Sequence, residues 1–194
     1  MRNAELIVRE ILYSALEKKK YELTQSQLSK ELKISLSIVH RTVMIMQNMG
    51  AVRIKQRGFA VQDVKKIMYY WASIRRLQQD IIYSTRVEKP VKEIEKLMPD
   101  TIVFACYTAY KLLFNDVPAD YSEVYVYGDE KLKSRFPQNK EPHNLFVLKK
   151  DKHIEQYGKV ATIANTFVDL WNLKEWYAKE FVKSMEARLY GVLE

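Results

Sequence analysis

The fold of the first third of this chain is decided by residues 24–62, TQSQLSKELKISLSIVHRTVMIMQNMGAVRIKQRGFAVQ. Thr24 with Gln27 three residues later is a capping-box pattern, so a short helix is expected to begin there. A turn beginning at Lys33 separates it from a second helix, which Ser35 can cap. The second helix carries apolar residues at helical spacing on one face, namely Val39, Val43 and Met46.

The residue pattern changes after Gly50, a residue type that commonly ends helices in the left-handed conformation. Polar and apolar residues then alternate on both sides of a Gln-Arg-Gly turn at residues 56–58, which is typical of a hairpin with a basic tip. The alternating apolar residues are Val52, Ile54, Phe59 and Val61. A first helix over residues 3–20 and a short strand over residues 21–23 are expected to pack against these elements. Residues 1–62 therefore have the element order of a winged helix-turn-helix DNA-binding domain.

Residues 35–52, SLSIVHRTVMIMQNMGAV, resemble the second helix and following strand of winged-helix regulators of the IclR and MarR kind. In such domains the second helix lies in the DNA major groove, and the hairpin touches the backbone or the minor groove. The resemblance implies contacts from Ser37, His40 and Arg41, which lie largely opposite the apolar stripe. The full set of predicted DNA-binding residues is Thr24, Gln25, Ser35, Ser37, His40, Arg41, Met44, Lys55, Gln56 and Arg57.

Positive charge is concentrated in the same region. Residues 1–62 carry 11 Lys or Arg against 5 Asp or Glu, whereas the whole chain carries 32 against 24, a net charge of +8. Clustered positive charge is the expected footprint of a polyanion such as double-stranded DNA. A solvated basic surface without a nucleic-acid partner is the alternative interpretation of this excess.

The cysteine and histidine content and the apolar runs of the chain bear on its cellular compartment and on metal or cofactor binding. The single cysteine, Cys106, excludes an intramolecular disulfide, and its apolar surroundings are typical of an inert buried thiol. The three histidines show no zinc-ligand spacing, so neither a metal nor a cofactor is predicted. Charged residues interrupt the first apolar stretch, and no apolar run is long enough to cross a bilayer. A cytoplasmic protein without a membrane partner is expected.

The rest of the chain is expected to divide into a connector and a second domain. Residues 63–89 begin with a helical apolar stripe, which favours either a helical connector that packs on its own chain or a dimerisation helix. Residues 79–90 are the expected junction, because they mix polar and apolar residues and end at a proline. The three tryptophans lie at helical spacing with other apolar residues and are expected in the core: Trp71, Trp171 and Trp176.

Residues 90–194 mix strand and helix patterns and form the second expected domain. A helix is expected between Pro90 and Pro99, and strands are expected at residues 122–128 and 145–150. Helical spacing returns from Thr162, with a break near Asn172. Periodicity does not decide between strand and helix for the apolar block within residues 101–114. These segments predict a small sheet covered by helices, and the fold class of the whole chain is α+β.

Three sequences in this domain are YTAYKL at residues 107–112, TFVDLW at 166–171 and AKEF at 178–181. With the Pro-containing loop and alternating strand between them, they resemble the C-terminal domain of AbiEi-type antitoxins. That domain has a nucleotidyltransferase-like core and follows a winged helix in type IV toxin-antitoxin systems. Thr108-Ala109 with Leu112 replaces the family's Ser-Ala-Leu, and its following glycine is not evident here.

An active nucleotidyltransferase needs two metal-binding carboxylates one residue apart after a Gly-Ser turn, because they hold the Mg²⁺ that neutralises the triphosphate. Here the turn reads Cys-Tyr-Thr, and the strand at residues 122–125 reads Ser-Glu-Val-Tyr, with Glu123 as its single carboxylate. The domain is therefore predicted to be a degenerate nucleotidyltransferase-like fold without enzymatic activity. Asp169 lies within an apolar helix. We interpret it as a structural residue, and a role in a functional site is the alternative.

The leading hypothesis is a sequence-specific DNA-binding transcriptional regulator, the autoregulating antitoxin of a type IV toxin-antitoxin system. Its predicted partners are double-stranded DNA, a second copy of the chain and a cognate nucleotidyltransferase-like toxin. One alternative is a nucleotide-binding enzyme with Glu123 and one further carboxylate as metal ligands, and another is a protein-interaction scaffold built on a winged helix. The candidates for that further carboxylate are Asp116, Asp120 and Asp129.

Overall fold

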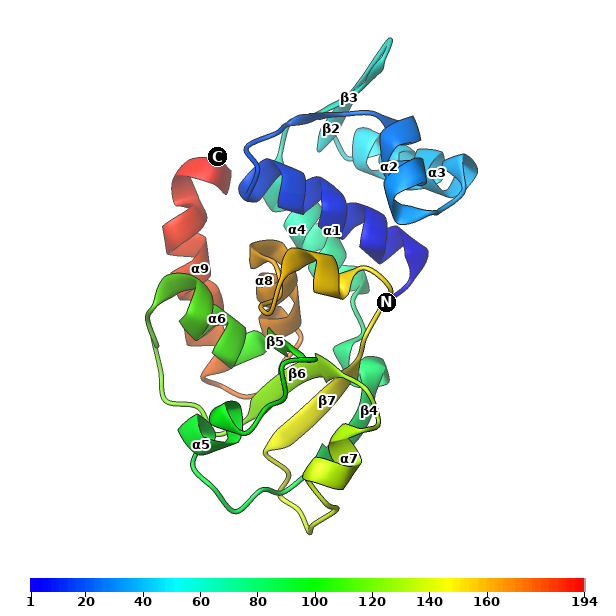
Figure 1. Cartoon of the computed structure of the whole chain (residues 1–194). Coiled ribbons are helices and arrows are strands. Elements are labelled where there is room, and N and C mark those ends of the chain that lie inside the picture. Colours follow the sequence, from blue (N-terminus) through cyan, green and yellow to red (C-terminus); the bar gives the residue numbers. More distant parts are fainter. Residues whose placement is uncertain (194) are drawn as a thin grey trace. The chain divides into compact units, whose positions relative to one another are not determined.

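The computed structural model describes the backbone of residues 1–193 and the side chains of residues 1–189. The chain has the expected α+β class, with helices and two small sheets (Figure 1). It divides into two compact units, one formed by residues 1–75 with the segment from Met185 onward and the other by residues 76–184. None of the helices in the described part of the chain is long and apolar enough to cross a membrane.

The first unit combines helices with a three-stranded antiparallel sheet in the order β1-β3-β2. Its elements are α1 (Asn3–Leu16), β1 (Glu22–Leu23), α2 (Gln25–Leu32), α3 (Leu36–Asn48), β2 (Val52–Lys55), β3 (Gly58–Val61) and α4 (Val64–Ile74). Helix α1 packs against α2, α3 and α4, while the β2–β3 hairpin extends away from the helices (Figure 1). Helix α1 ends before the expected residue 20, because Lys19 adopts a left-handed conformation with φ of 54°.

The boundaries of α2 and α3 follow local signals in the sequence. The Thr24 hydroxyl accepts a hydrogen bond from the backbone N–H of Gln27 at 3.1 Å, which confirms the predicted cap. Lys33 and Gly50 follow the two helices in the left-handed conformation, with φ of 53° and 71°. Ser35 precedes α3 as expected, but its hydroxyl lies 3.2 Å from another side chain, the Ser37 hydroxyl, and forms no capping bond.

A buried carboxylate, Glu5, joins helix α1 to helix α4. Glu5 is 2% exposed and accepts a hydrogen bond from the indole N–H of Trp71 at 3.2 Å. The Arg75 guanidinium lies 3.7 Å away, and Arg2 Nε donates to the same carboxylate at 3.0 Å. Since a buried charge is tolerated only with such partners, this network holds the two helices at one relative position.

The hairpin has a tighter turn than the sequence indicated. Lys55 pairs with Gly58, so the loop contains only Gln56 and Arg57, and Gly58 is the first residue of β3. Gly58 has a φ of 145°, and a Cβ atom there would lie 2.4 Å from the carbonyl oxygen of Leu23. Strand β1 can therefore approach the hairpin this closely only because position 58 is glycine.

The second unit is built on a four-stranded sheet in the order β4-β7-β6-β5. The central strands β6 and β7 are parallel, and each edge strand is antiparallel to its neighbour. The elements are β4 (Ile81–Thr85), α5 (Val91–Lys96), β5 (Val103–Ala105), α6 (Cys106–Phe114), β6 (Val124–Gly128), α7 (Leu132–Arg135), β7 (Leu145–Lys149), α8 (Ile163–Trp171) and the part of α9 (Ala178–Leu193) that precedes Met185. Two short 3₁₀ helices lie at Leu77–Asp80 and Ile154–Tyr157.

Strand β6 is buried along its whole length, as expected for a strand covered on both faces. Val124 and Val126 belong to a core cluster that includes residues of α5 and α7. Tyr125 and Tyr127 alternate with them and point to the opposite face. Helices α6 and α8 pack together, with contacts to β6 and β5 respectively.

The segment between the two predicted domains differs from the expectation. A helical connector was expected over residues 63–89, but helix α4 ends at Ile74 and residues 81–85 form strand β4. The expected junction at residues 79–90 therefore contains an edge strand of the second sheet. Its β-branched and aromatic residues favour a strand, and antiparallel pairing with β7, more than sixty residues away along the chain, places it at the edge of the sheet.

The structure decides the secondary structure of the undecided block within residues 101–114 and the burial of the three tryptophans. The undecided block contains strand β5 followed directly by helix α6, with Cys106 at the turn in a left-handed conformation and its thiol buried. Trp71 lies in the core as predicted, but the prediction is wrong for Trp171 and Trp176, which are 45% and 73% exposed. Trp171 is the last residue of α8, and Trp176 lies in the turn before α9 begins at Ala178, so the helical spacing that predicted its burial does not exist there.

Replacing Glu5 with Ala tests the α1–α4 network. We expect a loss of about 3 kcal/mol in the free energy of unfolding, because the Trp71 N–H and the Arg75 guanidinium lose a buried charged partner. Denaturant unfolding followed by circular dichroism measures the change. Glu31→Ala on the exposed surface of α2 is the control and should stay within about 0.5 kcal/mol of wild type; equal effects of the two variants would contradict the role of Glu5.

Candidate nucleic-acid interface

Helix α3 presents a polar face to solvent. Ser37, His40 and Arg41 are exposed and Met44 is half-buried, whereas the apolar stripe on the other side is buried, as the sequence predicted. The Arg41 guanidinium forms no hydrogen bond or ion pair with any residue in the described part of the chain. Its five donors are therefore available to a ligand.

The start of helix α2 lies beside this face. The side-chain oxygen of Gln25 is 3.1 Å from Nδ1 of His40, so a hydrogen bond joins the first turn of α2 to the exposed face of α3. The hydroxyl of Thr24 is engaged in capping α2, and the hydroxyls of Ser35 and Ser37 bond to each other. These contacts place the predicted residues of both helices in one continuous surface.

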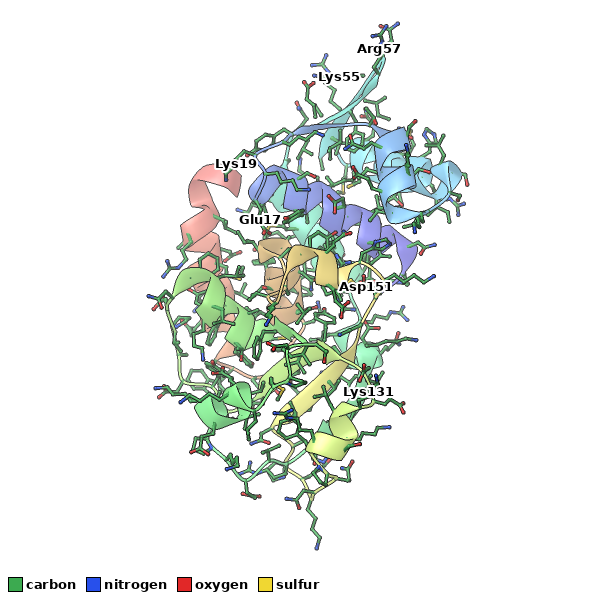
Figure 2. The ribbon with its side chains drawn as sticks, viewed as in Figure 1. Glu17, Lys19, Lys55, Arg57, Lys131 and Asp151 are labelled. Carbon is green, nitrogen blue, oxygen red and sulfur yellow. The ribbon has the colours of Figure 1, made fainter. Side chains whose placement is uncertain are left out.

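The hairpin supplies the remaining predicted residues. Lys55, Gln56 and Arg57 are all exposed, and Figure 2 shows Lys55 and Arg57 on the part of the hairpin that extends from the helices. The Lys55 ammonium forms an ion pair with the carboxylate of Glu22 on strand β1. Arg57 has no hydrogen bond or ion pair with a described residue.

A groove of about 500 Å³ lies between the hairpin and the segment that leads into α2. Its lining residues are Lys20, Glu22, Leu23, Thr24, Gln27, Lys55, Gln56, Arg57, Gly58 and Phe59. Three side chains of this lining are cationic and one is anionic, so the groove is suited to an anionic ligand.

Three polar residues of this groove are not predicted by the sequence. Lys20, Glu22 and Gln27 were not among the predicted site residues, although each lines the groove. The pairing of Glu22 with Lys55 spans 33 positions and has no local sequence signal. The pairing of both β1 and β2 with β3 brings the two side chains together.

Helix α3 also exposes two large apolar side chains that the sequence analysis had not singled out. Leu36 is 50% exposed and Ile45 is 41% exposed. Apolar side chains of this kind can contact the methyl group of thymine when a helix enters the major groove. They are therefore added to the polar residues as parts of the candidate interface.

The second unit does not gather the carboxylates considered as metal ligands. Glu123 accepts hydrogen bonds from the hydroxyls of Ser122, at 2.8 Å, and Tyr177. Asp116 and Asp129 instead accept backbone N–H groups within their own turns, at 2.8 and 2.9 Å. Among the described residues no group of three or more metal-binding side chains is found.

Asp169 lies in a buried hydrogen-bond network. It is fully buried and accepts hydrogen bonds from the Tyr127 hydroxyl at 2.5 Å and from the side-chain amide of Asn165 at 2.7 Å. The Asn165 amide also donates to the Tyr127 hydroxyl at 3.0 Å. Because these bonds tie α8 to β6, the arrangement agrees with the interpretation of Asp169 as a structural residue.

An aromatic cluster fills the sheet face beside helix α6. The ring of Tyr107 lies 5.2 Å from that of Tyr121 and 5.0 Å from that of Phe181, between ring centres. Burial raises the pKa of the phenols in this cluster, and nearby carboxylates raise it further, Glu175 acting on Tyr107. The hydroxyl of Tyr107 has no hydrogen-bond partner among the described residues.

With this geometry in hand, the chain was compared with known proteins. No protein-family model matches it, and no match was found among curated proteins or among solved structures. Function is therefore inferred from the geometry of the site.

The raised pKa values predict alkaline sensitivity of the second unit. The folded chain keeps phenolic protons that the unfolded chain releases above about pH 10, so these groups lower stability as the pH rises beyond that value and have no effect below it. The melting temperature followed by circular dichroism should fall between about pH 10 and pH 11.5. Full tyrosinate absorbance at about pH 11.5 with the structure intact would contradict this expectation.

Removing single hydroxyls from the cluster provides a matched comparison. Tyr107→Phe removes a buried hydroxyl that lacks a partner, so stability should stay unchanged or rise. Tyr121→Phe removes a hydroxyl that donates to Glu95 at 2.9 Å, so stability should fall by about 1 kcal/mol. Chemical denaturation of both variants measures the difference, and the reverse order would refute the assignment of partners.

Proposed function

We propose that the chain is a sequence-specific DNA-binding transcriptional regulator whose residues 1–62 act as a winged helix-turn-helix. The observation that carries this proposal is the exposed polar face of α3, where Arg41 has no partner among the described residues and His40 is bonded to the start of α2. Further support comes from the element order of the first unit and from the cationic tip of the hairpin. In this proposal α3 enters the major groove and the hairpin contacts the sugar-phosphate backbone.

Five of the predicted residues then have distinct roles. Arg41 reads a guanine, because its guanidinium can donate two parallel hydrogen bonds to O6 and N7. His40 is oriented by Gln25 and contacts a neighbouring base or phosphate. Lys55 and Arg57 neutralise phosphates and position the domain without reading sequence.

The proposal for the second unit rests on the resemblance to AbiEi-type antitoxins. We propose that the protein is the antitoxin of a type IV toxin-antitoxin system, represses its own operon and acts in the cytoplasm. The second unit would then contact a nucleotidyltransferase-like toxin or a second copy of the chain, and no catalytic step is assigned to it. An adjacent reading frame for a nucleotidyltransferase-like protein would support this role, and its absence would favour a stand-alone regulator.

Arg41 variants test base reading. Arg41→Ala should lose about 1 to 3 kcal/mol of discrimination between the operator and the same site with the contacted guanine replaced. Arg41→Lys keeps the charge but not the planar fork, so it should lose discrimination while keeping more of its affinity for random DNA. Fluorescence anisotropy with both duplexes gives the measurement. Equal losses on operator and random DNA for Arg41→Ala would show that the residue contacts only phosphates.

Binding to the protein's own upstream DNA tests the function as a whole. Purified protein is titrated with the upstream fragment and with a random duplex of equal length across a salt series. We expect a preference for the upstream fragment that persists at higher salt, because base contacts depend less on salt than phosphate contacts do. Equal and steeply salt-dependent binding to both duplexes would reduce the first unit to a basic surface and overturn the proposed regulator.

A further inference from the structure

The groove between the hairpin and the β1–α2 segment carries an internal ion pair between Lys55 and Glu22. We infer that this groove binds the DNA sugar-phosphate backbone, and that Glu22 competes with a phosphate for the ammonium of Lys55. The inference rests on the proposed DNA-binding function and adds to it a residue that sets the affinity.

The sheet geometry explains how the two side chains meet. Glu22 lies opposite Ala60 and Lys55 lies opposite Gly58, so both charged residues come from strands on either side of β3. Residues two positions apart on a strand share a face, and Gly58 and Ala60 are the residues of β3 on that face. Because both are small, the side chains of Glu22 and Lys55 can reach each other across β3.

The charges around the groove favour an anion once this pair opens. Lys20 and Arg57 line the groove, and neither forms a hydrogen bond or ion pair through its side chain within the described residues. The only acidic side chain of the lining is Glu22. A phosphate that displaces Glu22 from Lys55 would therefore meet three cationic side chains, whereas Glu22 occupies one of them in the free protein.

The ion pair between Lys55 and Glu22 is weak enough for a DNA phosphate to replace Glu22 as the partner of Lys55. The side chains of Lys55 and Glu22 are 47% and 72% exposed, and exposed pairs contribute little because water and salt screen them. A phosphodiester backbone offers Lys55 the same kind of charge together with the release of counterions. The competition should thus lower DNA affinity by a modest factor of about two to five.

The location also suits a backbone contact. Thr24 and Gln27 line the groove at the start of α2, and the adjacent Gln25 is bonded to His40 on the exposed face of α3. A duplex that contacts the α3 face therefore passes close to the mouth of the groove. A contact there carries no sequence information, because every nucleotide has the same phosphate.

The test compares the full-length wild type with Glu22→Gln, Lys55→Met and the double variant, on the upstream duplex and on a random duplex across a salt series. Glu22→Gln should bind both duplexes about two- to five-fold more tightly, and its salt slope should steepen by up to about 1. Lys55→Met should weaken binding to both duplexes. In the Lys55→Met background, the gain from Glu22→Gln should largely disappear.

The control is Glu31→Gln, which removes one negative charge from the exposed surface of α2 outside the groove lining. It reports the gain that any loss of an acidic residue produces through long-range electrostatics. The inference is overturned if Glu22→Gln gains no more than Glu31→Gln, or if its gain is the same with and without Lys55. All these positions are exposed, and circular dichroism of each variant verifies the fold.

The outcomes separate this inference from the proposed regulator. A wild type that binds both duplexes equally overturns sequence reading, yet the random duplex still reports phosphate binding and the coupling between Glu22 and Lys55. A wild type that prefers its upstream DNA but shows no such coupling supports the regulator and overturns the role of Glu22. A wild type that binds neither duplex overturns both.

Discussion

The buried carboxylate of Glu5 is the interaction on which the first unit depends. It accepts a hydrogen bond from Trp71 and lies beside Arg75, and so attaches the helix that packs against α2 and α3 to the helix that follows the hairpin. A carboxylate with so little contact with water is stable only when its partners are in place. The network holds α1 against α4, and α3, which carries Arg41, packs on α1 through its buried apolar stripe.

The candidate interface itself is held by weaker contacts. The bond between Gln25 and His40 and the ion pair between Lys55 and Glu22 are both solvent-exposed, and they can be exchanged for contacts with a ligand at small cost. A rigid core combined with an adaptable polar surface is compatible with the proposed binding and release of DNA. The buried network holds the helices in position, whereas the exposed pairs can open and so adjust the affinity for a ligand.

The second unit also has a buried polar network, made here by tyrosine, asparagine and aspartate side chains. Its central strand β6 is covered on both faces, by aliphatic packing on one and by tyrosines on the other. Asp169, Asn165 and Tyr127 satisfy one another inside that second face, while the Tyr107 hydroxyl lacks a partner among the described residues. Buried polar groups there join helices to the sheet, which leaves function to be sought on the surface of the unit.

The sequence by itself determined the elements of the first unit, the cap at Thr24, the turn at Lys33 and the solvent-facing side of α3, because caps, turns and helical periods are set by residues a few positions apart. It also predicted the α+β class and several strands of the second unit. Only the tertiary structure decided that residues 81–85 form an edge strand, that Trp176 is exposed, and that Glu22 faces Lys55. Residues 81–85 are of strand-favouring types, but their place at the sheet edge, like the other two features, depends on pairing and burial between segments distant in the chain, which no local pattern specifies.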